Sequence, residues 1–445
     1  MKRMDTPSSQ SQPQNITAGH DGVLEIEGDI DPDFSIPDDA RILIISQDQT
    51  FLTHGIHKFP AKFFPELPRY LIKRYSEPGQ IVLDPMCGSG TVVLEAILSE
   101  RTGVGIDIDP MARLITKVKT TPIEHDILHS AANNLMQLVH QRNTSGYITP
   151  SIPQFNYRDT WFKDFVLREL AIIRESIIDL KLSKGSNPRD FMRVVFSSII
   201  RDVSNADPHC TRTVIRKNLE KKISPGEVIT RFANALSKQI RAMHDFSEVC
   251  KSMNVGDVQI PDGIATQTGL GDDSIDLAVT SPPYINAVDY PRTHQLEMYW
   301  LDLVEDGPLS NMKRKYIGTE TVYKDEYSQL KVSGFESLDP LLERIFNRDP
   351  RRSFIIFKFF EDMKEQLKET FRVLHPGSHY CVAIGNNVIR GNLVESHRIL
   401  EEIATSDDVG FMIEKTFFSG VIRHFIKIPR KERMAGEWIL VLRKP

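Results

Sequence analysis

The fold is determined by residues 81–91, whose sequence is IVLDPMCGSGT. The apolar run at 81–83 is typical of a buried parallel strand, and the two glycines that follow permit a tight loop. Residues 91–98 carry apolar side chains at a spacing that suits a helix packed on a sheet. Residues 104–107, VGID, predict a second strand with a carboxylate at its end. The sequence therefore predicts an α/β fold that begins as a doubly wound, mostly parallel sheet of Rossmann-like type.

The glycine loop does not by itself identify its ligand, because Gly88 and Gly90 would let the backbone approach a nucleotide, a dinucleotide or S-adenosylmethionine (SAM). The phosphate-binding P-loop is excluded, since its spacing and its lysine are missing. Asp84, at the entry of the loop, suits the ammonium and sulfonium charges of SAM. Asp107 is placed to accept hydrogen bonds from ribose hydroxyls. The simpler alternative is a glycine-rich turn with two capping aspartates.

A second motif, TSPPY at 280–284, follows directly after a predicted strand at 275–280. Such a loop lies at the edge of an open α/β sheet where ligands bind. Two prolines stiffen it and remove two backbone donors, so that acceptors remain for an amino group. The Ser281 hydroxyl and the Pro282 carbonyl could then bind an aromatic amine, and Tyr284 could stack on a base that has left the duplex. The simpler alternative is a Pro-Pro turn with a surface tyrosine.

Charge is unevenly distributed over the 445 residues, although the net charge is only −5. Residues 1–50 hold ten acidic and three basic side chains, whereas residues 181–241 hold thirteen basic and five acidic ones. We expect an acidic, disordered N-terminal tail over residues 1–40. The cofactor-binding half should cover 41–120, a helical and partly basic insertion 121–255, and the catalytic half 256–445. The insertion is a candidate target-recognition region, or a packing domain with a solvated basic face.

The two motifs together resemble the amino-methylating DNA methyltransferases, and more narrowly the N4-cytosine group. The resemblance rests on DPMCGSGT at 84–91, TSPPY at 280–284 and HKFPAKFFPELPRYLI at 57–72. It continues through residues 290–320, IGNN at 384–387 and Glu437-Trp438. Serine at the first position of the catalytic loop resembles the N4-cytosine variant, whereas adenine-N6 enzymes usually carry Asp or Asn there.

The resemblance implies SAM as the cofactor, no metal, and double-stranded DNA as the partner, with the target base flipped out of the helix. The residues expected in catalysis are Ser281, Pro282, Pro283 and Tyr284. Those expected to bind the cofactor are His57, Lys62, Asp84, Pro85, Cys87, Gly88, Gly90, Thr91, Asp107 and Asp262. Asp262 stands apart, because the usual Gly-Asp-Ala that meets the adenine amino group is replaced here by DGIA at 262–265.

Basic residues in two places are expected to contact DNA. They are Arg212, Arg216 and Lys217 in the insertion, and Arg292 and His294 after the catalytic loop. Positive side chains there would neutralise phosphates and read guanine edges. Each of them is also compatible with an ordinary surface role.

The sequence thus predicts a site-specific, SAM-dependent methyltransferase that modifies the N4 of cytosine in DNA. Adenine-N6 methylation, guanine-N2 methylation of RNA, and a SAM-sensing module without catalysis are the alternatives. A restriction–modification role is expected, with a cognate endonuclease acting separately. No run approaches the ~20 apolar residues that cross a membrane, so a cytoplasmic, nucleoid-associated protein is expected.

Overall fold

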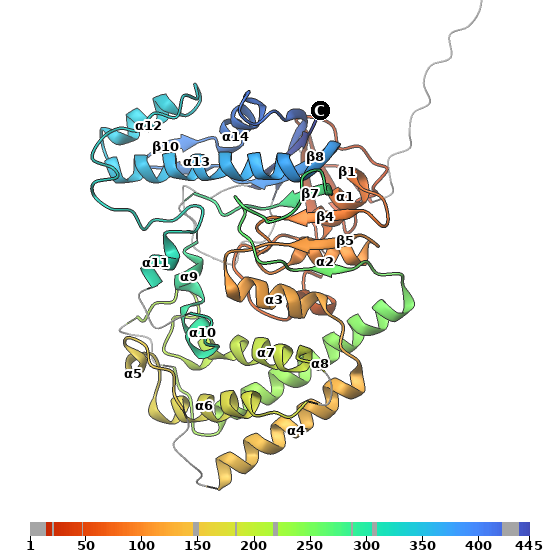
Figure 1. Cartoon of the computed structure of the whole chain (residues 1–445), viewed down its shortest axis with the longest axis vertical. Helices are drawn as coiled ribbons and strands as arrows, with labels where there is room; N and C mark the ends of the chain where they lie inside the picture. The colour runs from red at the N-terminus through yellow and green to blue at the C-terminus, as the bar shows by residue number, and fades with distance from the viewer. Residues whose placement is uncertain are drawn as a thin grey trace, which may run out of the picture.

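The computed structural model describes residues 15–19, 22–46, 48–145, 151–182, 185–216, 221–285, 288–304, 309–420 and 436–445. A single mixed sheet organises this part of the chain (Figure 1). Its strands are β1 (Ile16–Ala18), β2 (Val23–Glu27), β3 (Arg41–Ile45), β4 (Ile81–Asp84), β5 (Thr102–Gly105), β6 (Val258–Gln259), β7 (Ile275–Thr280), β8 (Leu374–Ile384), β11 (Met412–Gly420) and β12 (Gly436–Arg443). A separate hairpin is formed by β9 (Asn387–Ile389) and β10 (Asn392–Val394).

The order of strands in the sheet is β1-β2-β3-β11-β12-β8-β7-β4-β5-β6. All neighbours from β8 to β6 are parallel, whereas β12 runs antiparallel to both β8 and β11. From β4 the chain moves outward through β5 to β6, then returns to β7 and continues in the other direction to β8. The predicted doubly wound, mostly parallel α/β sheet is confirmed.

Helices cover both faces of the sheet and extend beyond it. They are α1 (Glu66–Tyr75), α2 (Thr91–Leu98), α3 (Pro110–Thr120), α4 (His125–Thr144), α5 (Arg158–Trp161), α6 (Asp164–Ile178), α7 (Asn187–Val203), α8 (Glu227–Ser252), α9 (Tyr290–Thr293), α10 (Gln295–Trp300), α11 (Leu309–Lys313), α12 (Asp339–Phe346), α13 (Pro350–Val373) and α14 (Ser396–Thr405), with a 3₁₀ turn at η2 (Leu52–Gly55). No helix within the described ranges has the length and apolar character that crossing a bilayer requires.

Alternate side chains of the central strands enter two different hydrophobic cores. Val82 and Leu277 pack with α1 and α2, whereas Leu83 and Ala278 pack with α12, α13 and α14. Because side chains of a strand point to opposite faces in turn, a strand covered on both faces is apolar throughout. This explains why the short runs at 81–83 and 275–280 contain so few polar residues.

Helices α4 to α8 form a lobe at the end of the molecule away from α12–α14 (Figure 1). Helix α7 begins at Asn187 and helix α8 at Glu227. The Glu227 carboxylate accepts a hydrogen bond from the Ser224 backbone N–H at 3.0 Å, as in a capping box. The lobe shares one core with α2, α3 and α10, so it packs directly on the sheet domain.

The prediction of a disordered tail over residues 1–40 is wrong for the described residues of this range, which include strands β1 and β2. The first strands, β1 and β2, are antiparallel to one another and extend the sheet edge through β3. Ile16, Ile26 and Ile36 are buried against α1 and β3. Acidic residues lie between these isoleucines, because an edge strand needs only one apolar face, and the sequence therefore reads as an acidic tail. Residues 1–14 lie outside the described residues.

A buried charge network fixes α2, the helix that follows the glycine loop, to its neighbours. Glu95 is 0% exposed and accepts hydrogen bonds from Arg69 Nε at 2.7 Å and from His54 Nε2 at 2.8 Å. Burial opposes ionisation of Glu95, but these hydrogen bonds outweigh it and hold the pKa of the carboxyl below its usual value. The carboxylate thereby links α2 to α1 and to η2.

We predict that Glu95→Ala lowers the free energy of unfolding by about 3 kcal/mol, because it leaves the largely buried Arg69 guanidinium with only the exposed Asp29 as a partner. Urea denaturation followed by circular dichroism measures this change. Glu248→Ala on α8 is the matched control, since its partner Lys251 and Glu248 itself are both exposed, and little change is expected there. Equal stabilities of the Glu95→Ala variant and the unmodified protein would contradict the structural role given to the network.

Candidate active site

The site forms where β4 and β7 lie side by side with their carboxyl ends at the same edge of the sheet. The chain leaves these two strands in opposite directions, and ligands of open α/β sheets bind at such a switch point. The last residues of the strands are joined by a hydrogen bond from Thr280 Oγ1 to Asp84 Oδ1 at 2.7 Å. A cavity of about 240 Å³ opens directly above them.

The glycine loop forms one wall of this cavity, and its conformation requires glycine. Gly88 and Gly90 have φ angles of 49° and 73°, in the left-handed region. A Cβ on Gly90 would lie 2.6 Å from Thr116 Cγ2, so a side chain there would also collide with α3. The Gly88 backbone N–H donates to Asp107 Oδ2 at 2.8 Å, which ties the loop to the end of β5.

Four carboxyl groups border the cavity: Asp84, Asp107 and Asp109, together with Asp362, which pairs with Lys358 at 2.8 Å. Burial raises the pKa of Asp84 and of Asp109 to about 7, and it also raises the pKa of Asp107. A bound cation would stabilise the ionised forms and lower these pKa values again. The hydroxyl of Thr91, which also borders the cavity, is buried without a hydrogen-bond partner. Acidic groups together with this unpaired hydroxyl suit a ligand that carries positive charge and polar atoms, as SAM does.

Most of the residues expected to bind the cofactor border this cavity. These are Lys62, Asp84, Pro85, Cys87, Gly88, Thr91 and Asp107. Lys62 Nζ donates to the carbonyl oxygens of Gln49 at 3.0 Å and His54 at 2.6 Å, and burial lowers its pKa to about 8. Gly90 does not border the cavity, but its left-handed backbone conformation gives the glycine loop its shape.

The structure does not bring His57 and Asp262 into the cavity. His57 is 7% exposed, and its Nδ1 lies 2.9 Å from the Lys58 carbonyl oxygen. Asp262 borders a neighbouring hollow that shares Asp107 and residues 108 and 264 with the main cavity. Its side chain is 99% exposed and pairs with Arg113 at 2.6 Å. A contact to the cofactor's adenine from Asp262 therefore stays a prediction.

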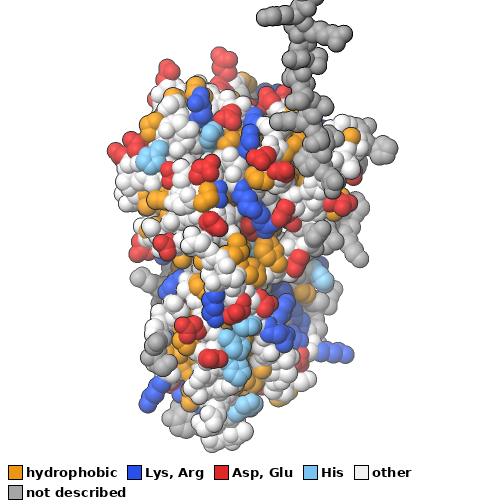
Figure 2. All heavy atoms as spheres, turned by 90° about the vertical axis from the view of Figure 1, so that its right-hand side faces the viewer, with side chains coloured by type: hydrophobic (Ala, Val, Ile, Leu, Met, Phe, Trp, Pro, Cys, Tyr) orange, Lys and Arg blue, Asp and Glu red, His pale blue; other side chains and the backbone are white. Residues whose placement is uncertain are grey.

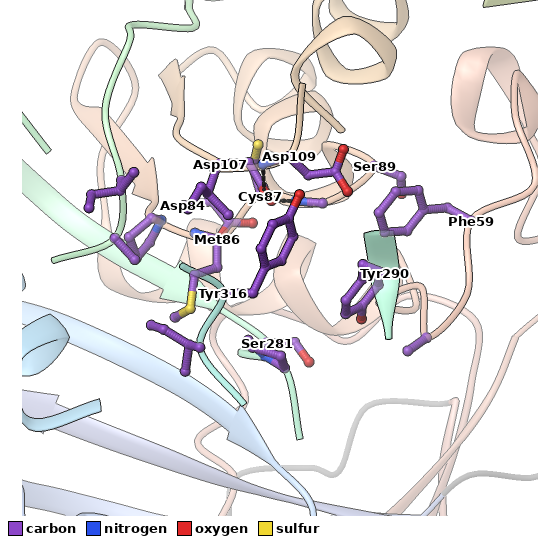
Figure 3. A pocket seen from close by; sticks show the side chains of 18 of the residues that line it. Phe59, Asp84, Met86, Cys87, Ser89, Asp107, Asp109, Ser281, Tyr290 and Tyr316 are labelled. Carbon is purple, nitrogen blue, oxygen red and sulfur yellow. Dashed lines mark hydrogen bonds between the residues drawn. The ribbon is translucent and has the colours of Figure 1, made fainter. Parts of the chain in front are cut away.

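The catalytic loop forms the opposite wall, where Ser281 and Pro283 border the cavity and Pro282 is buried. In Figure 3 the ring of Tyr316 lies between Ser281 and the carboxyl groups of Asp107 and Asp109. Tyr284 does not border the cavity. Its hydroxyl donates to Glu437 Oε1 and lies 3.5 Å from Ser281 Oγ. In this conformation Tyr284 does not border the cavity, so its stacking on a target base stays a prediction.

Aromatic residues that sequence reasoning missed complete the cavity. Phe59 and Tyr290 stack with ring centroids 5.6 Å apart, and Tyr316 lies across from them. Phe59 belongs to the segment 57–72, and the two tyrosines belong to the segment 290–320. The resemblance therefore pointed to these segments but not to these three residues. Other missed lining residues include Phe63, Met86, Ser89, Asp109, Lys358 and Asp362. The signal that could have found Phe59 is its place between Lys58 and Lys62 in that segment.

The segment with Arg212 and Arg216 lies beside the one with Arg292, because Thr213 Oγ1 donates to the Thr293 carbonyl at 2.7 Å. Arg216 pairs with the buried Asp207 at 2.6 Å, and Arg212 lies 4.0 Å from Glu320. Arg292 is exposed, and Lys217 lies outside the described residues. Figure 2 shows Lys and Arg side chains gathered beside histidines on the lower part of one face, where the helical lobe lies.

The expected role of His294 in DNA binding needs correction. His294 is only 2% exposed, and its ring stacks on Phe59 with centroids 5.0 Å apart. Burial lowers the pKa of His294 to about 3, so the ring is neutral at pH 7. A neutral, buried imidazole neither reaches nor attracts a phosphate group in this conformation.

Comparison with known proteins supports the chemistry of the cavity. Residues 41–117 match the N6/N4 methyltransferase family model, which is described as DNA methylase. The chain is 25% identical over 374 residues to the type II methyltransferase M.MvaI of Kocuria varians, covering 79% of this chain and 81% of that protein. It is 21% identical to the type II methyltransferase M.BsoBI of Geobacillus stearothermophilus, covering 80% and 78%. It is 22% identical to the type II methyltransferase M.AvaI of a Nostoc species, covering 80% and 79%.

These similarities support a SAM-dependent DNA methyltransferase, and SAM is the cofactor that such an enzyme uses. The matched family model covers methylation of both cytosine N4 and adenine N6. The segment 41–117 contains η2, the glycine loop and Asp107, so the matched family segment coincides with the cofactor side of the cavity.

We predict that SAM binding weakens as the pH falls from 7 to 6. Below pH 7 the Asp84 carboxyl, with its pKa of about 7, carries a proton that a cationic ligand must displace. Affinity should fall by up to about tenfold per pH unit in this range, because one proton is released on binding. Isothermal titration calorimetry at several pH values measures both the affinity and the proton release.

Asp84→Asn should bind SAM more weakly at pH 8 and should lose most of this pH dependence. Asp276→Asn is the control, because Asp276 accepts a hydrogen bond from the Ile81 N–H at the opposite edge of the sheet, and an asparagine oxygen can replace it. An Asp84→Asn variant with the pH dependence of the unmodified protein would show that another group, such as Asp109, binds the charge.

Proposed function

We propose that this protein transfers the methyl group of SAM to the exocyclic N4 of cytosine in specific DNA sequences. The observation that supports this most strongly is the position of Ser281. Its hydroxyl borders the cavity, on the wall opposite the acidic cofactor side. A nitrogen hydrogen-bonded to Ser281 would face the methyl group across the cavity. Serine at this position resembles the N4-cytosine variant of the loop, which favours cytosine over adenine.

Bound SAM supplies a methyl group made electrophilic by its sulfonium. The residues of this chain then have two tasks, which are to orient the amine and to exclude water. The Ser281 oxygen and the Pro282 carbonyl oxygen accept hydrogen bonds from the NH2 group. These bonds draw the nitrogen lone pair out of the ring and direct it along the line of attack. Acceleration comes from this positioning and from electrostatics, without a covalent enzyme intermediate.

The target base must leave the duplex, because the cavity lies within the protein at the sheet edge. Phe59, Tyr290 and Tyr316 provide aromatic surface beside the cavity, and Tyr284 is the residue proposed to stack on the base. Exposed basic side chains such as Arg292 and Lys315 are proposed to contact the phosphates on either side of the flipped nucleotide. The helical lobe of α4 to α8, together with the basic residues Arg212, Arg216 and Lys217, is proposed as the target-recognition region.

The biological setting follows from the relatives, which are type II methyltransferases. We propose that this enzyme marks host DNA in the cytoplasm, at the nucleoid, and that a separate endonuclease recognises the same sequence. Methylation of adenine N6 in DNA is the second candidate, since the matched family model includes both targets. An acceptor hydroxyl at Ser281 would serve either amine, and the shape of the base pocket would make the choice.

We predict that unmethylated genomic DNA treated with the enzyme and SAM yields N4-methyldeoxycytidine, measured by mass spectrometry of the released nucleosides. Ser281→Ala should lower the rate by about 10²-fold, because it removes one of the acceptors that position the amine. Ser274→Ala is the matched control, since Ser274 lies before the other end of β7 and its hydroxyl donates to the Gly271 carbonyl. Appearance of N6-methyladenine alone would replace the first candidate by the second, and methylation of RNA without DNA would contradict both.

A further inference from the structure

A chain of hydrogen-bonding groups leads from the cavity into the protein interior. Ser281 borders the cavity, and its Oγ lies 3.5 Å from the hydroxyl oxygen of Tyr284. The Tyr284 hydroxyl in turn donates to Glu437 Oε1. Glu437 lies at the start of β12 and is separated from the catalytic loop by 153 residues of sequence. The three groups therefore meet only through the pairing of β12 beside β8.

Methylation of an amino group requires an acceptor for one proton. A neutral NH2 group that forms a bond to carbon becomes positively charged at nitrogen and must lose a proton to give the product. Serine at the first position of the loop is a hydrogen-bond acceptor but no base. A carboxylate linked to it by hydrogen bonds would supply the missing base, and proton transfer by a positioned group typically contributes 10²- to 10⁴-fold.

We propose that Glu437 accepts the proton lost by the target amine, acting through Tyr284 and Ser281. As the nitrogen–carbon bond forms, the carbon–sulfur bond breaks and its electron pair stays on sulfur. The amine proton moves to Ser281 Oγ, the serine proton moves to the Tyr284 oxygen, and the tyrosine proton moves to Glu437 Oε1. Release of that proton to water after the product leaves restores the starting state. This inference rests on the proposed amino methylation and adds a positioning residue to it.

The surroundings of Glu437 suit an acceptor. Burial raises the pKa of Glu437, which makes its carboxylate a stronger base than an exposed one. Burial, followed by the nearby Glu437 carboxylate, raises the pKa of Tyr284 well above its usual value, so the phenol returns to its neutral form. Tyr284 is the titratable group that faces Glu437, and Tyr290 faces Tyr284 from α9.

The other elements around Glu437 bring no opposing charge in the part of the chain that the structure describes. On β11 its partner is Ser419, and the adjacent Trp438 stacks on His397 of α14 with centroids 4.3 Å apart. Burial lowers the pKa of His397 to about 4, so this ring is neutral at pH 7. Glu437 can therefore change its charge without a competing titration beside it.

The test uses single-turnover methylation of DNA by the full chain at saturating SAM and at pH values from 5 to 9, so that weaker SAM binding at low pH does not limit the rate. In the unmodified enzyme the rate should fall at acidic pH, as the Glu437 carboxylate becomes protonated and can no longer accept. Glu437→Gln keeps an oxygen that accepts the Tyr284 hydrogen bond but removes the basic group. We expect Glu437→Gln to react about 10²-fold more slowly at pH 8, and its rate should no longer fall at acidic pH. Glu437→Asp, which restores a carboxylate, should recover part of the rate and its fall at acidic pH.

Tyr284→Phe provides the second variant, because it retains the ring for stacking and removes only the hydroxyl that connects Ser281 with Glu437. The double variant should be no slower than either single variant, since both interrupt one pathway. Glu414→Gln on β11 is the matched control, as Glu414 faces His379 at the surface, and its rate and profile should not change. Unaltered SAM affinity and unfolding temperature in each variant show that the fold is intact.

The outcomes separate this inference from the proposed function. If the unmodified enzyme methylates DNA and Glu437→Gln keeps its rate and pH profile, the proton pathway is overturned and amino methylation stands. Additive losses in the double variant would likewise overturn the pathway, because they would show independent roles. If the unmodified enzyme transfers no methyl group to DNA, both proposals are overturned together.

Discussion

The hydrogen bond between Thr280 and Asp84 is the contact on which the site depends. It joins the last residues of two adjacent parallel strands, and the loop that follows each strand starts at one of its partners. The glycine loop leaves from Asp84 and the catalytic loop from Thr280, so their spacing is set by the strand spacing of ~4.8 Å rather than by loop flexibility. Two walls of one cavity are thereby fixed by backbone pairing, which is the most rigid part of such a fold.

This arrangement explains why the fold and the cofactor side could be predicted from the sequence. Strands buried on both faces have no polar alternation, so β4 and β7 appear as short apolar runs followed by loops. The glycines at 88 and 90 are required by left-handed backbone and by the approach of Thr116, and such requirements leave a local signature. The apolar runs and the left-handed glycines are local features of the sequence, and they are therefore visible without a structure.

Constraints that act across the sheet leave no such signature. Tyr284 has the position expected for a stacking residue, yet its hydroxyl is bound by Glu437, which is brought close only because β12 inserts between β8 and β11. His294 follows basic and polar residues and looks like a surface residue, but stacking on Phe59 buries it. The N-terminal strands were hidden in the same way, since Ile16 and Ile26 become core residues only after β3 pairs with β11.

The helical lobe and the catalytic side are parts of one packed structure. Trp300, at the end of α10, lies 5.9 Å from Phe162 and 6.2 Å from Phe196, both as ring-centroid distances to aromatic residues of the lobe. Thr213 Oγ1 donates to the Thr293 carbonyl at 2.7 Å, which joins the basic segment to α9 directly. Close-packed interiors transmit displacement, because they contain little free volume to absorb it. A displacement of the lobe would therefore reach α9 and α10, and through Tyr290 the wall of the cavity.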